Sequence, residues 1–167
     1  HNAHELIKEV IKNGGHVYAA GNGGSASICD HLCCDWMKGT YFDGRPALKV
    51  HSLTSNSAIL TAISNDFGYE YSLSKQIEMV ATKNDLVILI SSSGNSPNIV
   101  AAAQSAKSRS SKIIGLSGFS GGKLKELCDV SLYIPADNYG MAEDGHQILM
   151  HVLAQFLTIV RQNNKSV

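Results

Sequence analysis

Short apolar segments alternate with longer segments of helical period along this chain of 167 residues. The short segments are rich in Val and Ile and predict five buried strands: His16–Ala20, Ala47–His51, Asp85–Ser91, Lys112–Ser117 and Val130–Ile134. The longer segments predict helices over Ala3–Lys12, Ser25–Met37, Ser55–Ile63, Glu70–Ala81, Pro97–Ala106, Lys123–Leu127 and Gly140–Arg161. This alternation is typical of an α/β fold, here a three-layer α/β/α sandwich with a five-stranded parallel sheet.

The last predicted helix is the most apolar segment of the chain. Its apolar residues cover much of the helix circumference: Ile148, Leu149, Val152, Leu153, Phe156, Leu157 and Val160. Such a wide face packs either on the sheet of its own chain or partly against another subunit, and the pattern leaves both open.

The composition and net charge of the chain disfavour some functional classes. The chain has 44% hydrophobic and 17% charged residues, and 14 basic residues balance 14 acidic ones. A net charge of +0 does not favour binding to nucleic acid or to an anionic membrane, and no apolar run is long enough to span a bilayer. We expect residues 1–167 to form one domain, with N-terminal sequence missing because the chain opens on His1 rather than Met.

The spacing of the cysteines indicates the redox state of the cellular compartment. Cys29, Cys33, Cys34 and Cys128 lack the paired spacing of a disulfide framework or a zinc ribbon. A reducing, cytoplasmic location is therefore expected, with the thiols interpreted as small buried side chains rather than metal ligands.

Three predicted strands end in small polar loops: Ala20–Ser25, Ser91–Asn98 and Ser117–Gly122. Ser25 is a candidate N-cap for the helix that follows. Backbone N–H groups at a helix N-terminus bind phosphate without strong positive charge, and ligands of parallel sheets gather beyond the carboxyl ends of strands. No loop has the Walker or G-x-G-x-x-G pattern, so nucleotide binding is disfavoured, although ordinary turns would also explain glycine and serine here.

A second group of residues could carry chemistry. His31 and Asp35 are four residues apart and share one helix face, and Glu143 and His151 lie eight apart on the last helix. Two histidines and two carboxylates could form a zinc site or an acid–base pair. Spacing alone equally allows ordinary hydrogen bonds on a helix surface. His146, five residues before His151, is expected to have a surface or interface role.

Three motifs together carry a family resemblance: Gly21–Ser25, Asn65–Gly68 and Ser91–Asn98, in this order and spacing. From about residue 16 to residue 160, the chain resembles the SIS (sugar isomerase) domain, a flavodoxin-like fold, and especially the phosphoheptose isomerases. The resemblance implies that the sugar phosphate contacts Asn22, Ser25, Asp66, Ser91, Ser92, Ser93 and Ser96. It also implies a homotetramer with active sites between subunits.

The same resemblance assigns the second group to the acid–base pair and, in some members, to one zinc ion per subunit held by His31, Asp35, Glu143 and His151. Asp35 stands where the family has Glu, Glu143 where it has Gln, and Gly140 where it usually has an Asp that contacts the sugar. These departures suggest a divergent branch with altered substrate, altered metal use or lost activity.

The resemblance thus implies aldose–ketose isomerisation, most simply of sedoheptulose 7-phosphate to a D-glycero-D-manno-heptose 7-phosphate for lipopolysaccharide or capsule. Asp35 is expected as the carbon base and His151 as the acid–base group on oxygen, or the reverse, with Glu143 as base if Asp35 binds metal. The alternatives are a different sugar phosphate and a non-catalytic SIS module, like the DnaA-associated members, that senses a sugar phosphate or binds a protein.

Overall fold

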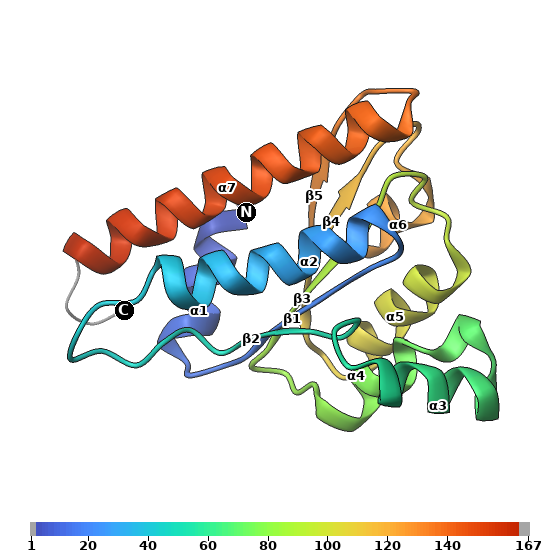
Figure 1. Ribbon diagram of the computed structural model, residues 1–167, viewed down its shortest axis with the longest axis horizontal. Coiled ribbons are helices and arrows are strands. Elements are labelled where there is room, and N and C mark those ends of the chain that lie inside the picture. The colour runs from blue at the N-terminus through green and yellow to red at the C-terminus, as the bar shows by residue number, and fades with distance from the viewer. Residues whose placement is uncertain (1–2, 164–167) are drawn as a thin grey trace.

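The computed structural model describes residues 3–163, which form a parallel sheet with helices on both faces (Figure 1). The strands are β1 (Val17–Gly21), β2 (Val50–Ser52), β3 (Leu86–Ser91), β4 (Lys112–Ser117) and β5 (Val130–Tyr133). The α-helices are α1 (Ala3–Lys12), α2 (Gly24–Cys34), α3 (Ser57–Phe67), α4 (Ser74–Val80), α5 (Pro97–Ser108), α6 (Gly122–Leu127) and α7 (Tyr139–Asn163). A π-helical turn, η1 (Asp35–Gly39), continues α2, and a 3₁₀ turn, η2 (Tyr69–Tyr71), follows α3.

The strands lie in the order β2-β1-β3-β4-β5 and every neighbouring pair is parallel. This is the flavodoxin-like order, in which the chain reverses direction across the sheet between β1 and β3. Ligands of such sheets bind at that reversal, beyond the carboxyl ends of the strands. The loops after β1 and β3 therefore flank the expected ligand crevice.

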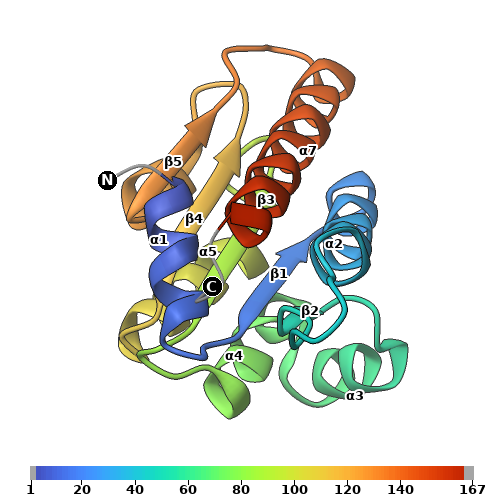
Figure 2. The same cartoon turned by 90° about the vertical axis from the view of Figure 1, so that its left-hand side faces the viewer.

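Apolar side chains form one core on each face of the sheet. On one face α1, α2 and α7 pack together, with Ile7, Leu32 and Met150 almost fully buried (Figure 2). On the other face α4, α5 and α6 contribute buried residues such as Ile77 and Ile99. The three-layer α/β/α sandwich predicted from the sequence is confirmed.

Several predicted elements differ from the observed ones: the helix predicted at Ser25–Met37 is α2 followed by η1, and the helix predicted at Ser55–Ile63 is α3, Ser57–Phe67. Two further elements differ more. The strand predicted at Ala47–His51 begins only at Val50, because β2 is an edge strand that pairs with β1 over three residues. The helix predicted at Glu70–Ala81 is observed as two elements, η2 and α4, with Ser72 and Leu73 between them, and Gly68, with φ of 101°, separates η2 from α3. Among residues 3–163, no helix combines the length and apolar character needed to cross a bilayer.

Candidate active site

A small polar cavity of about 120 Å³ lies at the carboxyl ends of β1 and β3, where the strand order reverses. It is lined by Asn22, Ser25, Ile90, Ser91, Ser92, Ser93, Ser96, Tyr139 and Glu143. We call this cavity the serine pocket. Of the seven residues predicted to contact the sugar phosphate, six line it, because both polar loops open at the same edge of the sheet.

The loop between β3 and α5 is held in place by the loop that follows β4. Gly94 has φ of 65°, and a Cβ at this position would overlap the backbone of Gly121, lying 2.6 Å from its carbonyl carbon. The carbonyl of Gly94 accepts a hydrogen bond from the Leu124 N–H at 2.9 Å, and that of Ser92 accepts one from the Gly118 N–H at 2.8 Å. The loop Ser117–Gly122 therefore supports the serine pocket rather than lining it.

Asn22 ties the β1 loop to the start of α5. Its side-chain amide exchanges two hydrogen bonds with Asn98, at 2.9 and 2.8 Å, and accepts a third from the Tyr69 hydroxyl at 2.9 Å. In this pair each amide donates one N–H to the oxygen of the other. Asn22 thus fixes the two loops of the pocket relative to one another.

Ser25 is not the N-cap predicted from the sequence. Helix α2 begins at Gly24, and the cap position is taken by Gly23, with φ of 53° and no side-chain capping bond. The glycine permits this backbone conformation, which a residue with a Cβ rarely adopts. Ser25 therefore lies inside the first turn, buried, and lines the serine pocket.

Glu143 lies in the serine pocket and not with the histidines. Its carboxylate packs against the start of α2, where a Cβ on Gly24 would be 2.5 Å from Oε2. The absence of a side chain at Gly24 makes room for Glu143. A helix N-terminus favours a nearby negative charge, so the N-terminus of α2 stabilises this carboxylate.

A second cluster lies farther along α2 and α7, which run side by side (Figures 1 and 2). His31 Nε2 is 3.4 Å from Asp35 Oδ1, and His151 Nε2 is 3.6 Å from Asp35 Oδ2. The two imidazole rings meet edge to face, with centroids 5.1 Å apart. Ligand atoms of all three residues lie within 4.8 Å of one another, which is the spacing of a metal-binding triad. Three of the four predicted metal ligands are therefore together, and Glu143 is outside the group.

The sequence analysis missed Gln147. Its Nε2 is 3.0 Å from His31 Nδ1 and 3.0 Å from His151 Nε2, so the amide can donate to both imidazoles. Gln147 lies four residues after Glu143 and four before His151, on the same face of α7. That spacing is the signal that could have found it.

Asp66 is not brought to the serine pocket in this chain. It is exposed near the end of α3 and accepts a hydrogen bond from the neighbouring Asn65 amide at 2.9 Å. Gly140 lies in the first turn of α7, next to the pocket residue Tyr139. Its lack of a side chain removes the contact that an Asp would offer there.

The expectation that His146 has a surface or interface role is wrong. It is fully buried, because it lies on the face of α7 that also carries Ala142 and Met150 toward the sheet. Within residues 3–163, its ring nitrogens make no hydrogen bond of normal geometry. Burial lowers the pKa of this imidazole, so it is held neutral.

The cysteines of α2 behave as structural side chains. All four cysteines are free. Burial raises the pKa of Cys29 well above its usual value and that of Cys33 to about 12. Since only a thiolate binds metal or attacks as a nucleophile, these two residues are suited to packing rather than to chemistry.

Comparison with known proteins identifies the family. The SIS domain family model matches residues 1–118. The phosphoheptose isomerase of Campylobacter jejuni subsp. jejuni serotype O:6 is 39% identical over 155 residues, covering 93% of this chain and 83% of that protein. The phosphoheptose isomerase of Burkholderia pseudomallei (strain 1710b) is 41% identical over 143 residues, covering 86% and 72%.

A solved structure shares the fold. The phosphoheptose isomerase GmhA from Neisseria gonorrhoeae superposes with a TM-score of 0.86 at 32% identity, covering 93% of this chain and 82% of that one. The sequence motifs and the parallel α/β fold agree with these similarities. The chain belongs to the SIS domain family, and within it to the phosphoheptose isomerases.

Proposed function

We propose that this chain is an aldose–ketose isomerase that converts sedoheptulose 7-phosphate into D-glycero-D-manno-heptose 7-phosphate, a precursor of surface polysaccharide. The observation that carries the proposal is the pairing of the serine pocket with the His31–Asp35–His151 triad along α2 and α7. His31 lies seven positions after Gly24 along α2, and Gly24 is beside the pocket. At the helical rise per residue, this is a distance of about 10 Å. An extended sugar phosphate can therefore place its phosphate in the pocket and its carbonyl end at the triad.

The serine pocket binds the phosphate in this proposal. Hydroxyl groups of Ser93 and Ser96 and backbone N–H groups at the start of α5 supply the donors. The N-terminus of α5 adds a favourable dipole, so binding requires no lysine or arginine in the lining. Ser91, Ser92, Ser25 and Asn22 complete the lining, and Glu143 directs the sugar toward α7.

The triad moves the protons. Asp35 removes a proton from C1 of the ketose to give a 1,2-enediol and returns a proton to C2, while His151 moves the proton between O1 and O2. The two groups lie on facing helices with 3.6 Å between Nε2 and Oδ2, so both reach the same pair of carbons. The opposite assignment of the two roles uses the same geometry. Glu143 is the reserve base if Asp35 serves only as a ligand.

The triad also fits a zinc ion. Two imidazole nitrogens and one carboxylate oxygen are a donor set that catalytic zinc sites use, with a fourth position left for substrate. When bound, zinc supplies Lewis-acid polarisation of the carbonyl and enediolate oxygens. His31, Asp35 and His151 would hold it, and Glu143 joins only if its side chain leaves Gly24.

The proposed assembly is a homotetramer in the cytoplasm, each subunit a single domain. Large apolar side chains remain more than half exposed along one side of α7: Met141, Ile148, Val152 and Ile159. Contiguous exposed apolar surface of this kind marks an interaction site. A second copy of the chain is the partner that this proposal assigns to it.

Turnover by paired variants tests the assignment. Asp35→Asn and His151→Ala should each lower turnover of sedoheptulose 7-phosphate by at least about a hundredfold, since each removes a proton-transfer group. Binding of the sugar phosphate, measured by thermal shift, should be retained because the serine pocket is intact. Lys107→Gln, an exposed change on α5, is the control. Full turnover in either variant would remove that residue from the mechanism.

A further inference from the structure

A cavity larger than the serine pocket lies at the amino ends of the strands, the end of the sheet opposite the candidate active site. It has a volume of about 370 Å³ and lies beside the amino ends of β1 and β2, between the end of α1, the segment 45–49 and the end of α7. Its walls include the apolar residues Ile11, Val17, Pro46 and Leu48. Small-molecule sites are typically apolar cavities of 300–1,000 Å³ with a few polar groups, so this cavity has the size and character of a binding site.

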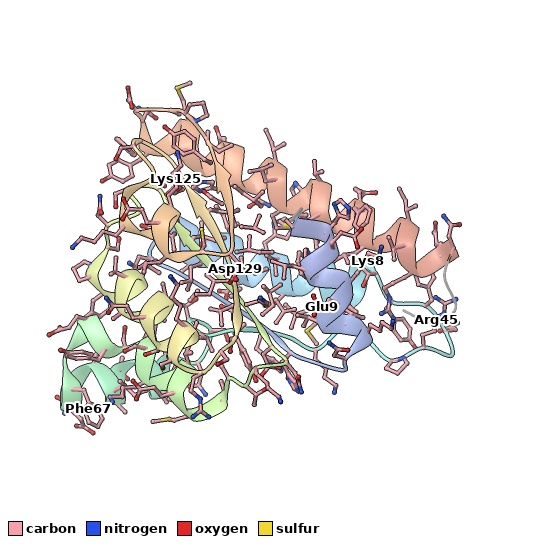
Figure 3. All side chains as sticks on the ribbon, turned by 180° about the vertical axis from the view of Figure 1, so that it is seen from behind. Lys8, Glu9, Arg45, Phe67, Lys125 and Asp129 are labelled. Atoms are coloured by element: carbon pink, nitrogen blue, oxygen red, sulfur yellow. The ribbon has the colours of Figure 1, made fainter. Side chains whose placement is uncertain are left out.

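The polar groups of this cavity are all basic. Arg45, Lys49 and Arg161 line it, and no acidic residue does among residues 3–163. Arg45 is the basic side chain labelled beside the end of α7 in Figure 3, on the opposite side of the molecule from Phe67. In a chain with equal numbers of acidic and basic residues, three cations around one cavity are an uneven distribution of charge.

Arg161 is the most unusual of the three, because it is only 3% exposed. Its Nε donates to the Thr40 carbonyl at 3.0 Å and its Nη2 to the Pro46 carbonyl at 2.7 Å. Within the described part of the chain, it forms no ion pair with a carboxylate. A buried charge without a counter-ion is costly, and a guanidinium has five N–H donors, so Arg161 retains donors for an anion.

Two further basic side chains, Arg45 and Lys49, lie near Arg161. Arg45 donates a hydrogen bond to the backbone carbonyl of Arg161, so a second guanidinium lies near the end of α7. Burial first, and then the charge of Arg45, lower the pKa of Arg161. An anion beside Arg161 would offset both effects, because it favours the charged form of the guanidinium. Lys49, whose Nζ reaches the Gly14 carbonyl at 3.0 Å, adds a third cation at the rim.

We propose that this cavity binds a small organic anion, with its apolar body against Ile11, Val17 and Leu48 and its anionic group at Arg161. The ligand class is a carboxylate, sulfonate or phosphate monoester with an aliphatic or aromatic portion. The site is separate from the serine pocket, since one lies at the amino ends of the strands and the other at the carboxyl ends. The proposal does not depend on the isomerase assignment.

Titration with 8-anilinonaphthalene-1-sulfonate, a fluorescent aromatic anion, tests the site. Ala47 is exposed and lines the cavity, so Ala47→Trp should fill it and weaken dye binding at least tenfold. Lys49→Gln should weaken binding about two- to fivefold, the range of an exposed ion pair. Lys107→Gln removes one positive charge from α5 on the other face and should change nothing. All three variants should retain isomerase turnover.

Competition then distinguishes an anion site from a purely apolar one. Octanoate should displace the dye at a concentration at least tenfold below that needed with 1-octanol. Arg161→Gln tests the guanidinium directly, and Ala47→Trp supports the test if loss of the buried arginine unfolds the protein. Equal dye binding by wild type and Ala47→Trp, or equal competition by octanoate and octanol, would overturn the proposal.

Discussion

Gly94→Ala is the change that most directly tests how the serine pocket is built. The backbone of Gly94 has φ of 65°, a conformation that costs a residue with a Cβ about 1–2 kcal/mol. The added methyl group would also overlap the Gly121 backbone, 2.6 Å from its carbonyl carbon, and overpacking costs about 1–3 kcal/mol more. We expect the free energy of unfolding to fall by roughly 2–5 kcal/mol, a fall in Tm of about 4–20 °C.

The same overlap should weaken phosphate binding. Relief of the clash requires the loop of Ser91–Asn98 to move by about 1 Å, because the added Cβ would overlap the carbonyl oxygen of Gly121 and real Cβ atoms do not approach other atoms closer than 3.0 Å. A hydrogen bond to a charged group contributes about 1.5–3 kcal/mol, so losing one raises KM about tenfold or more. Initial rates at varied sedoheptulose 7-phosphate, together with thermal unfolding, measure both effects.

Gly44→Ala is the matched control. Gly44 has φ of 81°, but a Cβ there would meet open space. It should therefore lose only the backbone term, about 1–2 kcal/mol, with KM unchanged. A Gly94→Ala enzyme with KM within twofold of wild type would refute the assignment of this loop to the phosphate.

Three further predictions concern single side chains. Ser93→Ala and Ser96→Ala should each raise KM about tenfold with kcat within twofold, and an unchanged KM in initial-rate measurements would count against phosphate binding by these hydroxyls. Gln147→Leu removes two hydrogen bonds that orient the imidazoles and should lower kcat about tenfold, whereas an unaltered kcat would make Gln147 a bystander. Since the pKa of buried His146 is lowered, the unfolded chain alone takes up this proton below about pH 6.5, and stability should fall as pH decreases from there. Urea unfolding at pH 7.5 and 5.5 should show a smaller fall for His146→Leu than for wild type, and equal falls would contradict this cause.

The sequence predicted the sheet well because its central strands are continuous apolar runs. The helix Ala3–Lys12 and the strand Lys112–Ser117 match the observed bounds. The errors occur where tertiary contacts or a positive φ, rather than the local hydrophobic pattern, determine the backbone conformation. At the edge strand β2, pairing with β1 alone sets the length, and after Gly68, whose φ is positive, the chain forms a short 3₁₀ turn before α4 begins.

Part of the candidate site could be predicted from residue spacing and from the family resemblance. Spacing placed His31 and Asp35 on one helix face, and the structure brings His151 to them. It could not reveal that Glu143 packs against Gly24, because that depends on how α7 crosses the start of α2. Gln147 escaped notice because a polar residue on a helix face is usually solvated. The structure alone shows its amide between two imidazoles.

Turnover of sedoheptulose 7-phosphate by the purified protein, followed by NMR in metal-free and zinc-supplemented buffer, tests the central claim most directly. The account predicts formation of the aldose D-glycero-D-manno-heptose 7-phosphate, and higher turnover when zinc can occupy the His31–Asp35–His151 triad. Failure to form the aldose in either buffer, with the sugar phosphate still bound in a thermal-shift assay, would contradict the isomerase assignment and leave a sugar-phosphate-binding module.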